Sequence, residues 1–143
     1  MIKKLFEINK SLTTNYNYYL FYGINEGSKN EKINEILLDI NKENIFTYEE
    51  NQILNDENSF LESVLNKSLF EERKTIIIKR ATNKILQLIQ IIIEKNSDNL
   101  IVINSGVLDK KSKLRNYFEK EKKLITAAFY EDTSGILSNI AKK

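Results

Sequence analysis

The sequence contains no cysteine, histidine, proline or tryptophan. Without cysteine and histidine, the chain can form no disulfide, no thiolate nucleophile, no imidazole base and no zinc site with nitrogen or sulfur ligands. Any catalysis would have to depend on Asp, Glu, Lys, Ser or Tyr.

A strong charge of one sign and a long apolar run are also missing. The 22 basic and 20 acidic residues are spread along the chain, and the net charge of +2 gives no electrostatic footprint for a phosphate backbone. The apolar stretches are far shorter than the roughly 20 residues of a membrane span, and the first residues contain no apolar run of signal-peptide length. We expect a cytoplasmic protein that contacts no membrane and contacts DNA at most indirectly.

The residues that are present have the composition of one globular domain. The 143 residues suffice for a single core, with 41% hydrophobic and 29% charged residues. Four apolar runs predict buried strands, and a fifth run that alternates between faces predicts a weaker strand. These runs are residues 18–22, 75–78, 100–103, 124–129 and, as the weaker strand, 45–48.

Helical patterns lie between these strands. Apolar residues recur at helical spacing in residues 33–40, 58–66, 82–95 and 111–120, and residues 2–8 predict a helix or an extended lead-in. The alternation predicts right-handed crossovers and an α/β fold with a mainly parallel sheet covered on both faces.

The C-terminal residues have a different pattern from the rest. A turn-like segment begins at Glu131, and Ile136, Leu137 and Ile140 then begin an amphipathic helix. We interpret residues 1–130 as one domain and residues 131–143 as the start of a connection to a further part of a longer protein.

The first predicted strand runs directly into a sequence that partly matches a phosphate-binding loop, G-x-x-x-x-G-K-[ST]. Only Gly23 and Lys29 match this pattern. Ser28 replaces the second glycine, and Asn30 replaces the hydroxyl that would bind Mg²⁺. Glu26 places a negative charge where phosphates would lie. The motif is therefore a degenerate phosphate loop.

The carboxylate that would bind the metal ion of a nucleotide site is missing as well. The strand predicted at residues 75–78 is followed by Lys79 and Arg80 instead. We expect no cofactor, no metal and no catalytic residue. Two interpretations of the loop remain: a tight turn into a helix capped near Ser28, or a relic of an ancestral ATPase. The alternative function is a nucleotide-binding P-loop ATPase or switch that uses Lys29.

A second feature is the adjacent pair Leu69 and Phe70 in an otherwise polar connection between a predicted helix and a predicted strand. The pair can fold back onto the core, as adjacent apolar loop residues usually do. It can instead form an exposed anchor that inserts into a pocket of a partner protein. Periodicity alone favours the first of these two interpretations.

Three segments together resemble a known family. They are Tyr-Tyr-Leu-Phe-Tyr-Gly at residues 18–23, Ser-Leu-Phe-Glu-Glu-Arg-Lys-Thr-Ile-Ile-Ile at residues 68–78 and Leu-Asp-Lys-Lys-Ser-Lys-Leu at residues 108–114. Their order resembles the N-terminal domain of the delta subunit of the bacterial DNA polymerase III clamp loader. The likeness covers essentially the whole chain, and the Ser-Leu-Phe segment is its most specific part.

The resemblance implies an AAA+-like, P-loop-type three-layer domain with a five-stranded, mainly parallel sheet that binds no nucleotide. It implies a non-catalytic subunit of the DNA polymerase III holoenzyme that binds and helps open the sliding clamp (beta subunit). The implied clamp-binding residues are Ser68, Leu69 and Phe70. We expect Glu71, Glu72 and Arg73 to form a polar rim, with Lys67 and Arg73 tuning the association rate.

The resemblance also implies parts beyond this chain. Family members continue into a small helical lid domain and a collar domain that assembles with the other clamp-loader subunits. Residues 131–143 would then begin the connection to the lid.

A third interpretation is a receiver-like or nucleic-acid-binding α/β domain. Asp39 and Asp109, with the lysines Lys110, Lys111 and Lys113, are its candidate residues. We read Asp109 as a helix N-cap and the lysines as a solvated face. Asn104 follows a strand, where AAA+ ATPases often place a residue that senses the γ-phosphate. Without a phosphate site, we expect Asn104 to be a turn residue.

Overall fold

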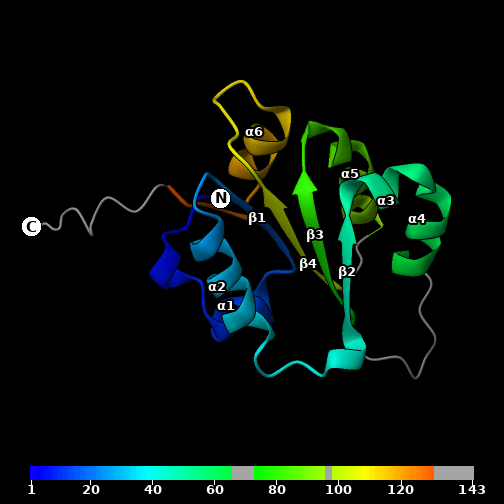
Figure 1. The fold of residues 1–143 in the computed structure, drawn as a ribbon, viewed down its shortest axis with the longest axis horizontal. Helices are drawn as coiled ribbons and strands as arrows, with labels where there is room; N and C mark the ends of the chain where they lie inside the picture. Colours follow the sequence, from blue (N-terminus) through cyan, green and yellow to red (C-terminus); the bar gives the residue numbers. More distant parts are fainter. Residues whose placement is uncertain (66–72, 96–97, 131–143) are drawn as a thin grey trace, which may run out of the picture.

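The computed structural model describes residues 1–65, 73–95 and 98–130. Its centre is a five-stranded sheet in the order β2-β3-β4-β1-β5, in which every neighbouring pair is parallel (Figure 1). The strands are β1 (Tyr18–Tyr22), β2 (Ile45–Glu49), β3 (Thr75–Ala81), β4 (Leu100–Ser105) and β5 (Leu124–Ala128). The predicted α/β class and all five predicted strands are confirmed.

Helices cover both faces of the sheet. They are α1 (Lys10–Asn15), α2 (Glu26–Leu37), α3 (Glu50–Asn55), α4 (Glu57–Leu65), α5 (Leu86–Glu94) and α6 (Lys113–Lys120), with short 3₁₀ turns at η1 (Leu5–Glu7), η2 (Lys42–Asn44) and η3 (Asn83–Ile85). The helices α1 and α2 pack on one face, and α3 to α6 pack on the other (Figure 1). The result is a three-layer domain.

The strand β1 shows why a continuous apolar run predicts a central strand. Side chains alternate across a sheet, so Leu20 and Tyr22 enter the core under α3 to α6, whereas Tyr19 and Phe21 enter the core under α1 and α2. All five residues of β1 are buried. A strand buried on both faces favours large apolar and aromatic side chains at every position.

Two short helices were not predicted. In α1 and α3 the apolar residues are too few to give a helical period, and capping residues define the starts instead. The side chain of Asn9 accepts a hydrogen bond from the Leu12 N–H at the start of α1. At the start of α3, Glu49 and Gln52 form a reciprocal capping box.

Two predicted caps are wrong. The helix α2 begins at Glu26 and is capped by Asn25, whose side chain accepts from the Ser28 N–H at 3.0 Å, so Ser28 is not the cap. The helix α6 is capped by Ser112, which accepts from the Arg115 N–H, and not by Asp109. In both cases a polar side chain that lies three residues before its partner N–H has the required geometry.

The outer edge of β5 is covered by the N-terminal residues. Ile2 pairs with Thr126 in a parallel bridge, and the Thr126 N–H donates to the Met1 carbonyl at 2.7 Å. The N-terminus is thus an extended lead-in followed by η1, which combines the two predicted forms. Within the described part of the chain, none of the helices has the length and apolar character that crossing a bilayer requires.

Candidate functional site

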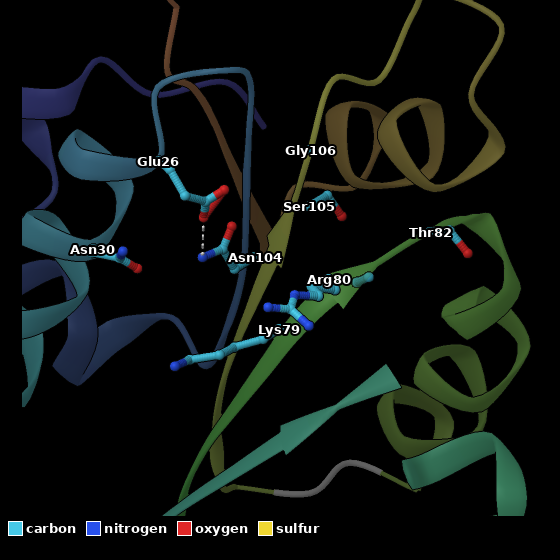
Figure 2. A pocket seen from close by; sticks show the side chains of 9 residues that line it. Glu26, Asn30, Lys79, Arg80, Thr82, Asn104, Ser105 and Gly106 are labelled. Carbon is cyan, nitrogen blue, oxygen red and sulfur yellow. Dashed lines mark hydrogen bonds between the residues drawn. The ribbon is translucent and has the colours of Figure 1, made fainter. Parts of the chain in front are cut away.

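A polar cavity of about 570 Å³ lies where the predicted phosphate site would be (Figure 2). Its lining residues come from the first turns of α2 and from the ends of β3 and β4: Glu26, Asn30, Lys79, Arg80, Ala81, Thr82, Asn104, Ser105 and Gly106. In open parallel sheets, ligands bind at the carboxyl ends of the strands near the point where the strand order reverses. Here that point is β1, which lies between β4 and β5.

Gly23 makes a tight turn rather than a phosphate-binding loop. Its φ is +125°, and an added Cβ would lie 2.0 Å from the Phe129 carbonyl oxygen. The Gly23 N–H donates to the Gly106 carbonyl at 3.0 Å. This glycine is therefore required by its positive φ and by the close approach of the Phe129 backbone just after β5, as the tight-turn interpretation expects.

The helix α2 begins inside the segment where a phosphate-binding loop would surround its ligand. The helix begins at Glu26, and acceptors within the chain take up N–H groups of its first turn: the Glu26 N–H donates to the Ile24 carbonyl at 2.9 Å, and the Ser28 N–H donates to Asn25 Oδ1 at 3.0 Å. The Lys29 N–H already donates to the Asn25 carbonyl at 3.1 Å. Gly27 also lies inside α2, and an added Cβ there would meet only Asn25 Oδ1 at 3.7 Å.

Lys29 is fully buried and points into the protein. Its Nζ donates to the Ser105 carbonyl at 2.6 Å and pairs with Glu26 Oε2 at 3.2 Å. The other carboxylate oxygen of Glu26 accepts from Asn104 Nδ2 at 3.2 Å. Lys29 therefore joins α2 to β4, and its ammonium is already engaged.

The remaining residues of the predicted loop are not gathered at one point. Asn30 lines the polar cavity, whereas Ser28 lines a separate groove with Leu5 and Phe129. The prediction that Asn104 is a turn residue is wrong. It lies within β4, is buried, and holds the Glu26 carboxylate.

The end of β3 brings two cations to the cavity. Ile78 pairs with Ile103 and Ala81 pairs with Ser105, so β3 holds one residue more than β4 between these pairs. Arg80 has a φ of +55°, which is uncommon for a residue with a side chain. Such a bulge re-aims side chains, and the consecutive residues Lys79 and Arg80 both line the cavity (Figure 2).

Among the described residues, one of these two cations forms an ion pair and the other does not. Arg80 Nη1 lies 2.9 Å from Glu49 Oε1, in a pair that is exposed on both sides. Lys79 has no ion pair among the described residues. Within this part of the chain there is also no group of three or more Asp or Glu residues that could hold a metal ion.

A second region of interest is where the connection between α4 and β3 leaves and rejoins the domain. We call these two ends, the last turn of α4 and the residues just before β3, the base of the connection. Asn99 is buried; its Nδ2 donates to the Val64 carbonyl at 2.8 Å, and its Oδ1 accepts from the Lys74 N–H at 3.0 Å. Lys74 Nζ donates to the Ser63 carbonyl at 2.7 Å. The last turn of α4 and the residue before β3 are thus held together.

Arg73 anchors the same connection from the β3 side. Its guanidinium donates to the carbonyls of Asp98 at 2.9 Å and Thr13 at 3.1 Å, and to Asn17 Oδ1 at 2.5 Å. Burial lowers the pKa of Arg73, and the nearby Tyr19 and Asp98 oppose that shift. Arg73 therefore contacts the folded domain, which differs from the predicted polar rim around the apolar pair, and its effect on the association rate stays a prediction.

The residues predicted to contact the clamp are not part of the described structure. Ser68, Leu69 and Phe70 lie outside the described residues, as do Lys67, Glu71 and Glu72. The structure therefore describes how the two ends of this connection are held, and not the connection itself.

The acidic and basic residues of the third interpretation do not form a site. Asp39 follows α2 at the amino end of the sheet, whereas Asp109 follows β4 at the carboxyl end. Asp109 Oδ1 accepts from the Lys111 N–H at 2.9 Å. The lysines Lys110, Lys111 and Lys113 are exposed, as a solvated face requires.

The chain is similar in fold to a DNA clamp loader delta protein. The solved structure of the Bacillus subtilis DNA clamp loader delta protein (YqeN) matches 96% of this chain with a TM-score of 0.67 and 17% sequence identity. This chain spans 47% of that protein, which is about half its length. No family model matches the sequence, and no curated protein matches it. The likeness supports the AAA+-like fold.

Sequence reasoning missed Asn99, and it gave Arg73 a different role from the one seen in the structure. Both residues stand next to predicted strands, but a hydrogen-bond partner far away in sequence leaves no periodic signal. Glu50 was also missed: it is buried, and its carboxylate accepts from the Thr82 N–H at 2.7 Å and from the Thr82 hydroxyl at 2.9 Å. In the sequence it is one of many glutamates.

Proposed function

We infer that this chain is the clamp-binding module of a clamp-loader delta-type subunit. In this role it binds the sliding clamp (beta subunit) during DNA replication, helps to open it, and hydrolyses no ATP itself. The observation that supports this most strongly is the structural likeness to a clamp loader delta protein over 96% of the chain. The order of the sequence motifs supports the same function independently.

The geometry of the degenerate phosphate loop supports a module without nucleotide chemistry. A P-loop ATPase or switch would need the Lys29 ammonium at the phosphates, but Lys29 is buried against Ser105 and Glu26. It would also need a hydroxyl at position 30 and a metal-binding carboxylate near the end of β3. Asn30 and Lys79 occupy those places. The ATPase alternative is therefore the weaker one.

The base of the connection between α4 and β3 supports Leu69 and Phe70 as the clamp-binding anchor, with Ser68 beside them. Asn99 and Arg73 fix the two ends of this connection. Fixing the ends lowers the conformational entropy that binding must remove. Burying both side chains would remove roughly 200–300 Å² of apolar surface from water, which contributes about 5–8 kcal/mol before the costs of association.

Clamp opening sets a further requirement. A module can open a ring only by binding the open form more tightly than the closed form. We propose that residues 1–130 supply this contact and that residues 131–143 lead toward a helical lid. The other loader subunits would then bind through the region that follows.

The direct test is a calorimetric titration of this chain with the sliding clamp encoded by the same genome. The double variant Leu69→Ala/Phe70→Ala is expected to weaken binding by at least about 100-fold, because anchors of this kind dominate interface energies. The matched control is Phe6→Ala/Leu38→Ala, which removes two apolar side chains that are 77% and 80% exposed elsewhere on the surface. Equal affinities for the wild type and the first double variant would reject the assigned anchor.

A further inference from the structure

Glu26 is held in the way that a bound anion would be held. Its two carboxylate oxygens have different partners: Oε2 lies 3.2 Å from Lys29 Nζ, and Oε1 lies 3.2 Å from Asn104 Nδ2. The carboxylate is in the first turn of α2, where the helix dipole favours negative charge. Figure 2 shows the Glu26 and Asn104 side chains pointing toward each other at the cavity.

The buried ammonium explains why an anion is needed at this point. Lys29 has 0% side-chain exposure, and a buried charge is destabilising unless it is paired and hydrogen-bonded. The Ser105 carbonyl supplies one acceptor, and Glu26 supplies the opposite charge. The Glu26 side chain is 63% exposed, so the anion that compensates Lys29 stands at the opening of the cavity.

The cavity holds further donors that Glu26 does not use. Lys79 has no ion pair among the described residues, and Arg80 is held in a left-handed conformation beside it. The Ser105 hydroxyl is buried, and no described residue forms a hydrogen bond with it. The Asn30 side chain also lines the cavity. These groups are of the kind that bind oxyanions, since ammonium, guanidinium, hydroxyl and amide groups all donate hydrogen bonds.

We propose that this cavity is a latent oxyanion site that the chain itself fills with the Glu26 carboxylate. Glu26 is an intramolecular ligand of Lys29 and Asn104, and it excludes phosphate-class anions from the donors behind it. Removing this carboxylate opens a metal-independent site for phosphate or pyrophosphate, with Lys29, Asn104 and Lys79 as its donors. The proposal concerns the internal structure of the domain and is independent of clamp binding.

The test compares pyrophosphate binding by the wild type, Glu26→Ala and Glu26→Gln, using calorimetry without divalent metal and thermal unfolding at constant ionic strength. The wild type is expected to show no saturable binding. Glu26→Ala is expected to bind pyrophosphate at least about tenfold more tightly than the wild type, since a like charge at contact distance is removed. Its unfolding temperature is expected to rise with pyrophosphate and not with potassium chloride.

Two controls separate this effect from a general change in charge. Glu31→Ala removes an exposed carboxylate from the same helix outside the cavity, and it should behave as the wild type does. Adding Lys79→Gln to Glu26→Ala should lose at least about threefold of the gained affinity, because the positive charge of one donor of the opened site is removed. A loss of the gain in this double variant supports the assigned donors.

Three results would overturn the proposal. They are pyrophosphate binding by the wild type as tight as by Glu26→Ala, an equal gain in Glu31→Ala, or no gain in either Glu26 variant. If Glu26→Ala fails to fold, the uncharged and nearly isosteric Glu26→Gln decides the question. Refolding of Glu26→Ala by pyrophosphate alone would support the proposal.

Discussion

Lys29 Nζ donates a 2.6 Å hydrogen bond to the carbonyl oxygen of Ser105, so the lysine that matches the phosphate-loop pattern is a structural link between α2 and β4. A lysine that serves a ligand can be removed with little effect on folding. One that is fully buried and paired with Glu26 cannot, because its loss leaves a cavity and an unsatisfied carbonyl.

We therefore expect Lys29→Ala to lower the free energy of unfolding by about 2–4 kcal/mol. Urea denaturation followed by circular dichroism would measure it. The control Lys113→Ala changes an exposed lysine and should alter stability by less than about 0.5 kcal/mol. If Lys29→Ala kept wild-type stability, Lys29 would be free for a ligand and the ATPase alternative would regain support.

Two glycines that follow β1 should respond oppositely to the same substitution. Gly23→Ala should lower the free energy of unfolding by more than about 3 kcal/mol, since it combines a positive φ with an impossible approach to the Phe129 carbonyl at 2.0 Å. Gly27→Ala lies inside α2 with ordinary space around it and should raise stability by about 0.5–1 kcal/mol. Thermal denaturation of both variants would check this, and a stable Gly23→Ala would contradict the turn geometry.

The strands could be predicted because burial on both faces leaves a simple signal. The five apolar residues of β1 are an example: both faces of the strand are covered by helices, so each position needs an apolar side chain. The helix α3 left no such signal, since Ile53 and Leu54 are the only apolar residues in its six. Its start depends on Glu49 and Gln52, which a count of apolar residues cannot detect.

The site could be predicted in its location but not in its contacts. Gly23 and Lys29 drew attention to the end of β1, and a polar cavity lies beside it, but the descent of this segment from a phosphate loop stays a prediction. The partners of Lys29 could not be read from the sequence, because Ser105 is brought beside α2 only by the pairing of β4 with β1. The roles of Leu69 and Phe70 came from a family resemblance and stay a prediction.

Arg73 and Arg80 provide a matched pair for testing the base of the connection between α4 and β3. Arg73→Lys should lower the free energy of unfolding by about 1.5–3 kcal/mol, because one ammonium cannot reach the acceptors on Asp98, Thr13 and Asn17 together. Arg80→Lys affects an exposed ion pair with Glu49 and should change stability by less than about 1 kcal/mol. Urea denaturation would rank the two variants, and equal effects would show that the Arg73 contacts are unimportant.

The same Arg73 variant bears on the proposed function. If the anchored connection presents Leu69 and Phe70, Arg73→Lys should also weaken clamp binding, although Arg73 faces inward. The comparison should be made at a temperature where both arginine variants are fully folded. If Arg73→Lys were less stable than the wild type but bound the clamp with the same affinity, the contacts of Arg73 would not be needed for clamp binding by Leu69 and Phe70.

The alkaline limit of stability should depend on Tyr22. Burial, together with a hydrogen bond to Tyr130, raises the pKa of Tyr22 to about 12, whereas the pKa of an unfolded tyrosine is about 10. Between these values the unfolded state has lost a proton that the folded state retains, so the free energy of unfolding falls as the pH rises. The contribution is fully present below pH 10 and is lost as the pH rises toward 12.

Tyr22→Phe removes this titrating group, so its stability should decline less steeply over the same pH range than that of the wild type. Urea denaturation midpoints measured at half-unit intervals from pH 9 upward would compare the two slopes. Burial also raises the pKa of Tyr19, so some decline should remain in Tyr22→Phe and should decrease further in Tyr19→Phe/Tyr22→Phe. Identical slopes in the wild type and the double variant would mean that other groups set the alkaline limit.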